Sequence, residues 1–205
     1  MNKLRILLTV FFVLILFGAA DAQKKGTIGF TLSTLNTNSM LQSAAIKKDF
    51  MVFDGQGFIS FSADYWYPVN DWLELETGAN YSLQSFEKTV VSGLIDGSNK
   101  AVNQTEDIAY HVVNLPVGFR VGFLNIGFIN GGLLVDITQQ EPGIGSYFGF
   151  GIKLDSEVGY GIFVNPYLKT HSILPINFDQ NANRILETGI RLGVSYSFDN
   201  VFRKR

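Results

Sequence analysis

The sequence contains no cysteine, which excludes both a disulfide framework and a metal site built on thiolates. It also has no surplus of positive charge, because 16 Lys and Arg residues face 18 Asp and Glu residues and the net charge is −2. That balance argues against nucleic acid as a partner, since nucleic-acid binding needs a basic surface. After residue 22 no apolar run approaches the ~20 residues that a membrane-spanning helix needs. The mature chain is therefore expected to be soluble, peripheral or a membrane barrel.

The first 22 residues form a targeting segment. A basic start, "MNKLR", precedes the apolar run "ILLTVFFVLILFGA", and small residues at Ala20 and Ala22 provide a cleavage site. This pattern predicts a secretory signal peptide over residues 1–22 and an exported domain over residues 23–205. The alternative is a retained N-terminal anchor, but a cleavage site directly after the apolar run favours removal.

The rest of the chain is rich in glycine and in aromatic residues, with 21 Gly and 14% aromatics, as suits many short strands in a closed sheet. Eight segments alternate apolar and polar residues with a period of two, which predicts β-strands. They cover residues 26–34, 57–69, 72–86, 111–123, 126–139, 146–161, 163–173 and 185–198. Tight links follow the second, fourth and sixth segments, and longer polar links follow the others. This alternation predicts an all-β, eight-stranded antiparallel up-and-down transmembrane barrel of the outer-membrane type.

The two faces of these segments decide between a soluble and a membrane barrel. The apolar faces carry aromatic residues near the strand ends, as the interfacial girdles of membrane barrels do. These residues are Tyr65, Tyr67, Tyr81, Tyr160, Tyr196 and Phe198. The polar faces mix charges with glycine, whereas a solvated strand face usually avoids glycine because it weakens strands. We therefore expect the apolar face to contact lipid in the bacterial outer membrane. A soluble sheet with a wet polar face is the alternative.

The polar faces carry charges of both signs. In an eight-stranded barrel side chains fill the interior, and charges enclosed there must pair, because an unpaired buried charge costs several kcal/mol. We predict a structural charge network in the lumen, with Arg120 paired to Glu74, Glu76 or Glu187. Its members are Asp64, Glu74, Glu76, Arg120, Asp136, Lys153, Asp155, Glu157, Lys169, Glu187 and Arg191.

Two segments contain irregularities. Ile126 and Phe128 fall out of phase with the rest of their segment, so a bulge or an early turn is expected there. Pro116 interrupts the segment 111–123 and cannot donate a hydrogen bond to a neighbouring strand. Counting ~9 residues back from the following turn reaches about Leu115. Pro116 is therefore predicted near the outer rim, where ladders end or bulge and water or a loop replaces the missing donor.

No catalytic, cofactor or metal site is predicted. His171, Ser172 and Glu187 suggest a lipid A deacylase triad, but adjacent residues of a strand point to opposite faces, which a triad cannot use. Asp64, Glu74, Glu76 and Asp136 form an alternative metal site. The lumen network is favoured over it, because oxygen-only sites usually lie in loops with Asp, Asn and Gly spacing.

Three stretches resemble one known family. "LPVGFRVGF" resembles the mid-barrel strand signature of the PorT-like outer-membrane barrel proteins of Bacteroidetes. "GFGIKLDSEVGYGIFVNPYLKTHSILPINF" resembles the sixth strand, turn and seventh segment of that family, and "RILETGIRLGVSYSF" resembles its closing strand. The resemblance covers nearly all of residues 23–198.

This chain departs from the family pattern at two places. It has "NPY" where the family often has an Arg-Tyr pair, and "DNVFRKR" follows the last strand, so that Phe198 or Phe202 would replace the terminal aromatic assembly signal.

Because no catalytic site is visible, we expect a non-enzymatic outer-membrane protein with membrane lipid among its partners. The resemblance implies that it is a component of an envelope or secretion assembly, with other proteins of that assembly as partners. The alternative is that the protein acts through its extracellular loops. A channel is not expected, because the lumen of an eight-stranded barrel is too narrow. A lipid-modifying enzyme and a small-ligand-binding barrel remain alternatives.

Overall fold

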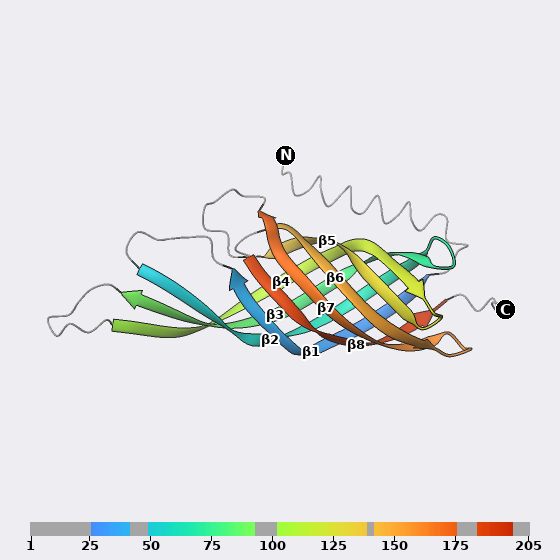
Figure 1. The fold of residues 1–205 in the computed structure, drawn as a ribbon, viewed down its shortest axis with the longest axis horizontal. Coiled ribbons are helices and arrows are strands. Elements are labelled where there is room, and N and C mark those ends of the chain that lie inside the picture. Colours follow the sequence, from blue (N-terminus) through green and yellow to red (C-terminus); the bar gives the residue numbers. More distant parts are fainter. Residues whose placement is uncertain (1–25, 42–48, 93–101, 139–141, 176–183, 199–205) are drawn as a thin grey trace.

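The computed structural model describes residues 26–41, 49–92, 102–138, 142–175 and 184–198. The predicted signal peptide and Phe202 lie outside these ranges. Eight antiparallel strands pair in sequence order, and β1 pairs with β8, so that the sheet closes into a barrel (Figure 1). The strands are β1 Thr27–Leu41, β2 Asp49–Pro68, β3 Leu73–Ser92, β4 Val102–Phe123, β5 Gly127–Thr138, β6 Gly143–Asp155, β7 Tyr160–Pro175 and β8 Arg184–Ser197. The predicted eight-stranded up-and-down barrel is confirmed.

Among the described residues, no helix has the length and hydrophobicity that crossing a membrane requires.

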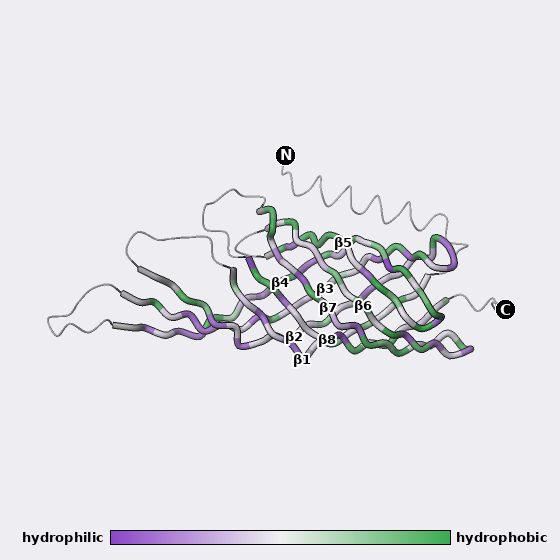
Figure 2. Tube along the Cα trace, viewed as in Figure 1, coloured by the Kyte–Doolittle hydropathy of each residue, from purple (hydrophilic) through white to green (hydrophobic). Residues whose placement is uncertain are grey.

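The barrel wall is apolar outside and polar inside. Hydrophobic and hydrophilic residues are interspersed along the strands (Figure 2). Phe30, Phe61 and Phe119 are each more than half exposed on the outer face, while Asn114 and Glu187 are fully buried. A soluble barrel has the opposite distribution, because it hides its apolar face. An apolar exterior of this kind is stable in contact with lipid. A closed barrel also leaves no unpaired sheet edge in the membrane. The protein is thus a transmembrane barrel of the bacterial outer membrane.

The tight turns all lie at one end of the barrel, together with the start of β1 and the end of β8. They cover residues 69–72, 124–126 and 156–159. Leu124 and Asn125 have positive φ values of 51° and 61°, and this backbone lets the three-residue link reverse the chain between β4 and β5. In outer-membrane barrels the short turns face the periplasm, so the longer links lie at the cell exterior.

The predicted sixth strand, 146–161, is wrong at its end. β6 ends at Asp155, and residues 156–159 form a turn that Gly159 closes with φ of 90°. Ser156 holds this turn, since its amide donates to the Tyr160 carbonyl at 2.7 Å and its hydroxyl accepts from the Tyr160 amide at 3.1 Å. Val158 is an exposed apolar residue in the turn, and it extends the apolar alternation past the end of the strand.

Strands β2, β3 and β4 extend beyond the barrel as a three-stranded arm, at the left of Figure 1. We define the arm as residues 49–57 of β2, 85–92 of β3 and 102–111 of β4. Within the described ranges, β1 pairs with β2 only as far as Ser33, and β4 pairs with β5 only from Val112 onward. The predicted segments omitted most of the arm, because its sequence lacks strict alternation. The arm is held together by the main-chain pairing of β2 and β4 with β3.

Side chains replace the main-chain ladder where the arm leaves β1. The amide of Gly57 donates to Asn38 Oδ1 at 2.8 Å, and the amide of Phe58 donates to Asn36 Oδ1 at 3.0 Å. Gly57 has φ of 91°, a conformation that favours glycine. The β2–β3 register shifts at the same place, between Gly55 and Gly57. These contacts satisfy β2 without pairing it to β1, so the arm can diverge from the barrel.

An apolar cluster closes the lumen beneath the arm. Met40, Phe86, Val112 and Ile185 are buried together, and Tyr110 packs edge-on against Phe86 with ring centroids 5.7 Å apart. Because these residues come from β1, β3, β4 and β8, the cluster joins the arm to the barrel.

Pro116 does not lie near the outer rim, so that prediction is wrong. It lies inside the unbroken β4–β5 ladder, opposite Leu134. On the β3 side the ladder skips from Thr77↔Val117 to Asn80↔Asn114 without changing register. The missing donor of Pro116 therefore costs pairing to one neighbour only. The count from the turn failed because the barrel part of β4 is longer than nine residues.

Candidate functional site

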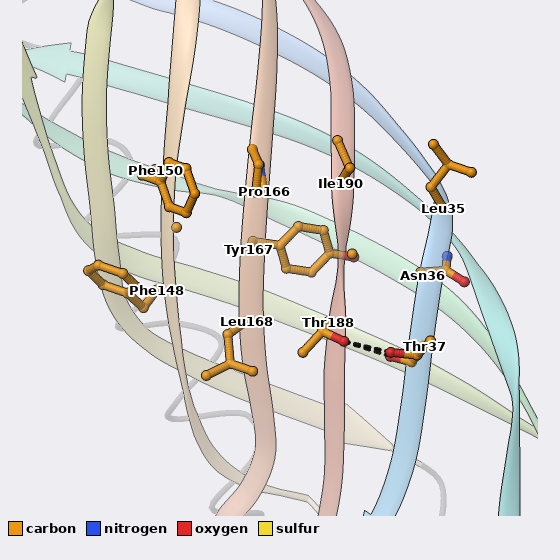
Figure 3. A pocket seen from close by; sticks show the side chains of 12 residues that line it. Leu35, Asn36, Thr37, Phe148, Phe150, Pro166, Tyr167, Leu168, Thr188 and Ile190 are labelled. Atoms are coloured by element: carbon orange, nitrogen blue, oxygen red, sulfur yellow. Dashed lines mark hydrogen bonds between the residues drawn. The ribbon is translucent and has the colours of Figure 1, made fainter.

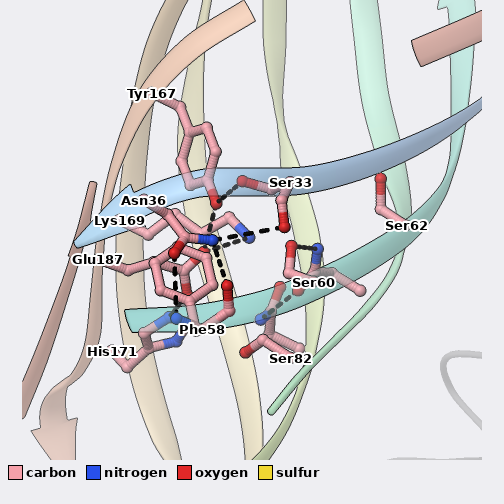
Figure 4. A network of polar contacts seen from close by, with 12 residues as sticks. Ser33, Asn36, Phe58, Ser60, Ser62, Ser82, Tyr167, Lys169, His171 and Glu187 are labelled. Carbon is pink, nitrogen blue, oxygen red and sulfur yellow. Dashed lines mark hydrogen bonds and ion pairs between the residues drawn. The ribbon is translucent and has the colours of Figure 1, made fainter. Parts of the chain in front are cut away.

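The outer half of the lumen is organised around Glu187, a fully buried carboxylate on β8 (Figure 4). Its Oε1 accepts a hydrogen bond from the Tyr167 hydroxyl at 2.7 Å and lies 3.4 Å from Lys169 Nζ. Its Oε2 accepts from Gln84 Nε2 at 2.9 Å and lies 2.9 Å from His171 Nε2. Four side chains from β3 and β7 thus surround one carboxylate, and they satisfy the charge that burial would otherwise penalise.

His171 bridges Glu187 to a second carboxylate. Its Nδ1 lies 2.8 Å from Asp136 Oδ1, while Asp136 Oδ2 accepts from the main-chain amide of Ser172 at 2.7 Å. Ser172 has φ of 52°, and the β6–β7 register shifts there. Both His171 and Ser172 are therefore buried, and the expectation that they point to opposite faces is wrong, because the bulge breaks the alternation. Carboxylates engage both ring nitrogens, so neither is left to activate a serine hydroxyl.

The inner half of the lumen is organised around Arg120. Its guanidinium carbon lies 3.7 Å from the centre of the Phe128 ring and 4.3 Å from that of Trp66. Phe163 packs edge-on against Trp66 at 5.2 Å. Arg120 Nε lies 3.7 Å from Glu74 Oε2, so Glu74 is the partner among the three expected carboxylates. Cation–π contact with desolvated rings stabilises this buried charge.

Phe128 is in phase with the lumen-facing residues of β5, and the ladders to β4 and β6 continue through it without a register shift. The bulge expected at Ile126 and Phe128 is therefore absent from this described region, and the alternative, an early turn, is found at Ile126, which belongs to the turn 124–126. The alternation appeared broken because an apolar ring points into a polar lumen, where it contacts Arg120.

Between the two halves lie Asp64, Glu76 and Arg191, all buried. Asp64 Oδ2 accepts from the Ser62 hydroxyl at 2.6 Å. Glu76 Oε2 accepts from Asn130 Nδ2 at 2.9 Å. Charges and amides therefore fill the lumen along its length.

The structure separates the predicted network into an interior and a mouth. Seven of its members are buried in the lumen: Asp64, Glu76, Arg120, Asp136, Lys169, Glu187 and Arg191. Glu74 and Lys153 are half-buried at the tight-turn mouth, where Lys153 Nζ lies 2.9 Å from the exposed Asp155. Glu157 is exposed in the turn that ends β6, so its placement in the lumen was wrong.

Several residues in these contacts were not among the predicted members, notably Tyr167, His171, Gln84, Trp66 and Phe128. Strand phase was the available signal, because Tyr167 and His171 share a face with Lys169, and Trp66 shares one with Asp64. Only the closed barrel shows which of them meet.

The four carboxylates of the alternative metal site do not converge. Asp136 contacts His171, Glu74 faces Arg120, Asp64 bonds Ser62 and Glu76 bonds Asn130, as described above. No group of three or more His, Asp or Glu side chains in the described ranges is arranged to hold a metal ion.

A vestibule of about 600 Å³ opens at the tight-turn end. Trp72, Glu74 and Lys153 line it, together with the buried Arg120 and Phe128, which form its floor. The lumen is thus closed by Arg120 and its rings at this end and by the apolar cluster at the other.

No protein-family model and no curated protein matches the sequence. Solved structures of similar shape include the outer membrane protein AlkL, determined by solid-state NMR in DMPC lipid bilayers, with 11% identity and a TM-score of 0.47 over 86% of this chain and 91% of that chain. OprG from Pseudomonas aeruginosa has 12% identity and a TM-score of 0.41 over 85% and 96%. Ail from Yersinia pestis has 12% identity and a TM-score of 0.36 over 86% and 100%. The identification as an outer-membrane barrel rests on the closed sheet and its apolar exterior.

Proposed function

We propose that this protein is a non-enzymatic component of an outer-membrane envelope or secretion assembly, and that it acts through the arm. The observation that carries the proposal is the combination of a filled lumen with three strands that extend well beyond the barrel. The resemblance of residues 115–123, 149–178 and 184–198 to PorT-like barrel proteins of Bacteroidetes supports a secretion role within this class.

The filled lumen argues against a channel and against a ligand-binding barrel. A solute crossing it would have to separate Glu187 from Lys169, His171, Tyr167 and Gln84. Breaking a buried ion pair costs roughly 3–5 kcal/mol. Action at the exterior needs no such opening.

The arm carries a row of three acidic residues across its strands. Asp54 lies opposite Glu87, and Glu87 lies opposite Asp107, so the three carboxylates share one face. Like charges placed directly opposite each other destabilise a sheet. A partner with a basic surface would relieve this repulsion, and we propose that the assembly partner presents such a surface.

A lipid-modifying enzyme has less support. It needs a base that is free to take a proton, yet both nitrogens of His171 contact carboxylates and the residue is buried inside the barrel. Lipid would reach the outer wall and not this site.

The test is complementation of a deletion strain with four proteins: the wild type, a chain in which residues 87–107 are replaced by an Asn-Gly turn, Glu87→Lys, and the control Glu157→Lys. The secreted proteins and lipid A are measured for each. We expect the deletion to lose a class of secreted proteins, which the wild type restores and the two arm variants do not. Glu157→Lys makes the same charge change at the opposite end and is expected to complement fully.

Folding is monitored by the shift in gel migration on heating, which all four proteins should show. Glu87→Lys is expected to stabilise the arm, so its failure to complement cannot be ascribed to unfolding. Full complementation by both arm variants would refute the role of the arm. Altered acylation of lipid A in the deletion strain would favour the enzyme.

A further inference from the structure

The lipid-facing wall of β6, β7, β8 and β1 contains a groove with a volume of about 500 Å³ (Figure 3). Three consecutive residues of each strand lie side by side there, in the registers of the barrel. The middle residue of each set faces the lumen, and the outer two rows form the walls. Because the side chains of the middle row point inward, the main chain of the four strands forms the floor. The groove therefore runs around the barrel, across the strands.

The width of the groove selects a narrow occupant. Its walls are two residues apart along each strand, which is about 7 Å at ~3.4 Å per residue. An α-helix with its side chains is about 10–12 Å wide and does not enter such a groove. A single hydrocarbon chain does. Phe148 and Phe150, each more than half exposed, form the ends of the two walls on β6, and no charged residue lines the groove.

The polar groups of the groove are already satisfied. The hydroxyls of Thr37 and Thr188 lie 2.7 Å apart and bond to each other. The Tyr167 hydroxyl and the Asn36 amide point inward to partners on Glu187 and Phe58. A free fatty acid would place its carboxylate here without a partner. A chain whose headgroup stays at the membrane surface brings no polar group into the groove.

We propose that this groove is a binding site for one acyl chain of a bilayer phospholipid. The groove lies near the middle of each of its four strands, as at residues 166–168 of β7, and so within the hydrocarbon belt. Each wall ends in a phenylalanine on β6 and in Leu35 or Thr37 on β1, and the small side chains of Pro166 and Thr188 lie between these ends on β7 and β8, where the acyl chain would lie (Figure 3). The site is independent of the arm and of the proposed assembly role.

The test uses the full-length protein in phosphatidylcholine vesicles that contain a small fraction of phosphatidylcholine with a photoactivatable diazirine on one acyl chain. Cross-linked residues are mapped by mass spectrometry. We expect labelling to concentrate at residues 35–37, 148–150, 166–168 and 188–190. It should exceed the labelling of Phe61 on β2 and Phe119 on β4, which are about as exposed as Phe148 and Phe150.

Variants make the test specific to the groove. Thr188→Phe places a ring across it, and we expect the concentrated labelling to be lost. Val194→Phe makes a matched change on the same outward face of β8, outside the groove, and should leave it intact. Thr188→Val removes the hydroxyl but keeps the shape, and should also leave it intact.

Uniform labelling around the barrel, or unchanged labelling in Thr188→Phe, would show ordinary contact with surrounding lipid and overturn the proposal. Loss of the signal in Thr188→Val would overturn recognition by shape. Displacement by added lipopolysaccharide would reassign the site to lipid A.

Discussion

Glu187→Gln tests whether the lumen depends on paired charges. The substitution keeps the size of the side chain and its contacts with Tyr167 and Gln84, but it removes the negative charge. Lys169 then loses the carboxylate that lies 3.4 Å from its Nζ, while its side chain remains 2% exposed. His171 keeps its contact with Asp136. The main effect is therefore a single buried ammonium group without a counter-ion.

The magnitude follows from that isolated charge. Removing one partner of a buried ion pair costs about 3–5 kcal/mol of unfolding free energy. Lys169→Met should cost less, because Glu187 retains His171 and two hydrogen-bond donors. In the double variant both charges are gone, so we expect a coupling of about 0.5–3 kcal/mol between the two sites.

The assay is urea unfolding of the protein in lipid vesicles. The fluorescence of the two tryptophans, Trp66 in the lumen and Trp72 at the mouth, reports the transition. Glu157→Gln removes an exposed carboxylate and serves as the control, with a change expected within about ±0.5 kcal/mol. A loss below about 1 kcal/mol in Glu187→Gln, or strictly additive effects in the double variant, would refute the charge-paired lumen.

Three further predictions concern other parts of the molecule. Asn165 Nδ2 donates to the Phe150 carbonyl at 2.8 Å, at the place where Pro166 has no amide hydrogen to donate. Asn165→Ala should cost about 1–3 kcal/mol in urea unfolding, and Pro166→Ala added to it should recover part of the loss by restoring a main-chain donor. Equal stability of the single and double variants would contradict this role. Arg120→Lys should lose about 1–2 kcal/mol because an ammonium group stacks less well on the rings, and an unchanged unfolding midpoint would count against the cation–π contacts. Glu87→Lys should stabilise the arm by about 0.2–1 kcal/mol and slow its amide hydrogen exchange. Faster exchange there would show that the acidic row does not repel.

The alternation of apolar and polar residues, together with the alternation of tight and longer links, was sufficient to predict the barrel. Successive side chains of a strand point to opposite faces, so the sequence alone assigns Phe119 to one face and Arg120 to the other. Aromatic residues and glycine then indicated which face meets lipid. The same alternation of faces along a strand also placed Lys169 and Glu187 on the inner face.

Local irregularities escaped this reasoning. Val158, in the turn at residues 156–159, continues the alternation of apolar and polar residues, so the strand appeared to extend past Asp155. The bulge at Ser172 turns two adjacent residues inward, which no period of two predicts. The arm lacks strict alternation, and its strands are held by main-chain pairing, which any side chain permits.

The sequence by itself determined which side chains face inward, because that property depends only on the local pleat of each strand. Which of them meet was decided by closure of the barrel. Gln84 and Glu187 are 103 residues apart, yet they bond at 2.9 Å across the lumen. Arg120 met Glu74 among its three expected partners because the β3–β4 register places them opposite each other. Contacts across the lumen depend on register, bulges and closure together, and these are properties of the whole sheet.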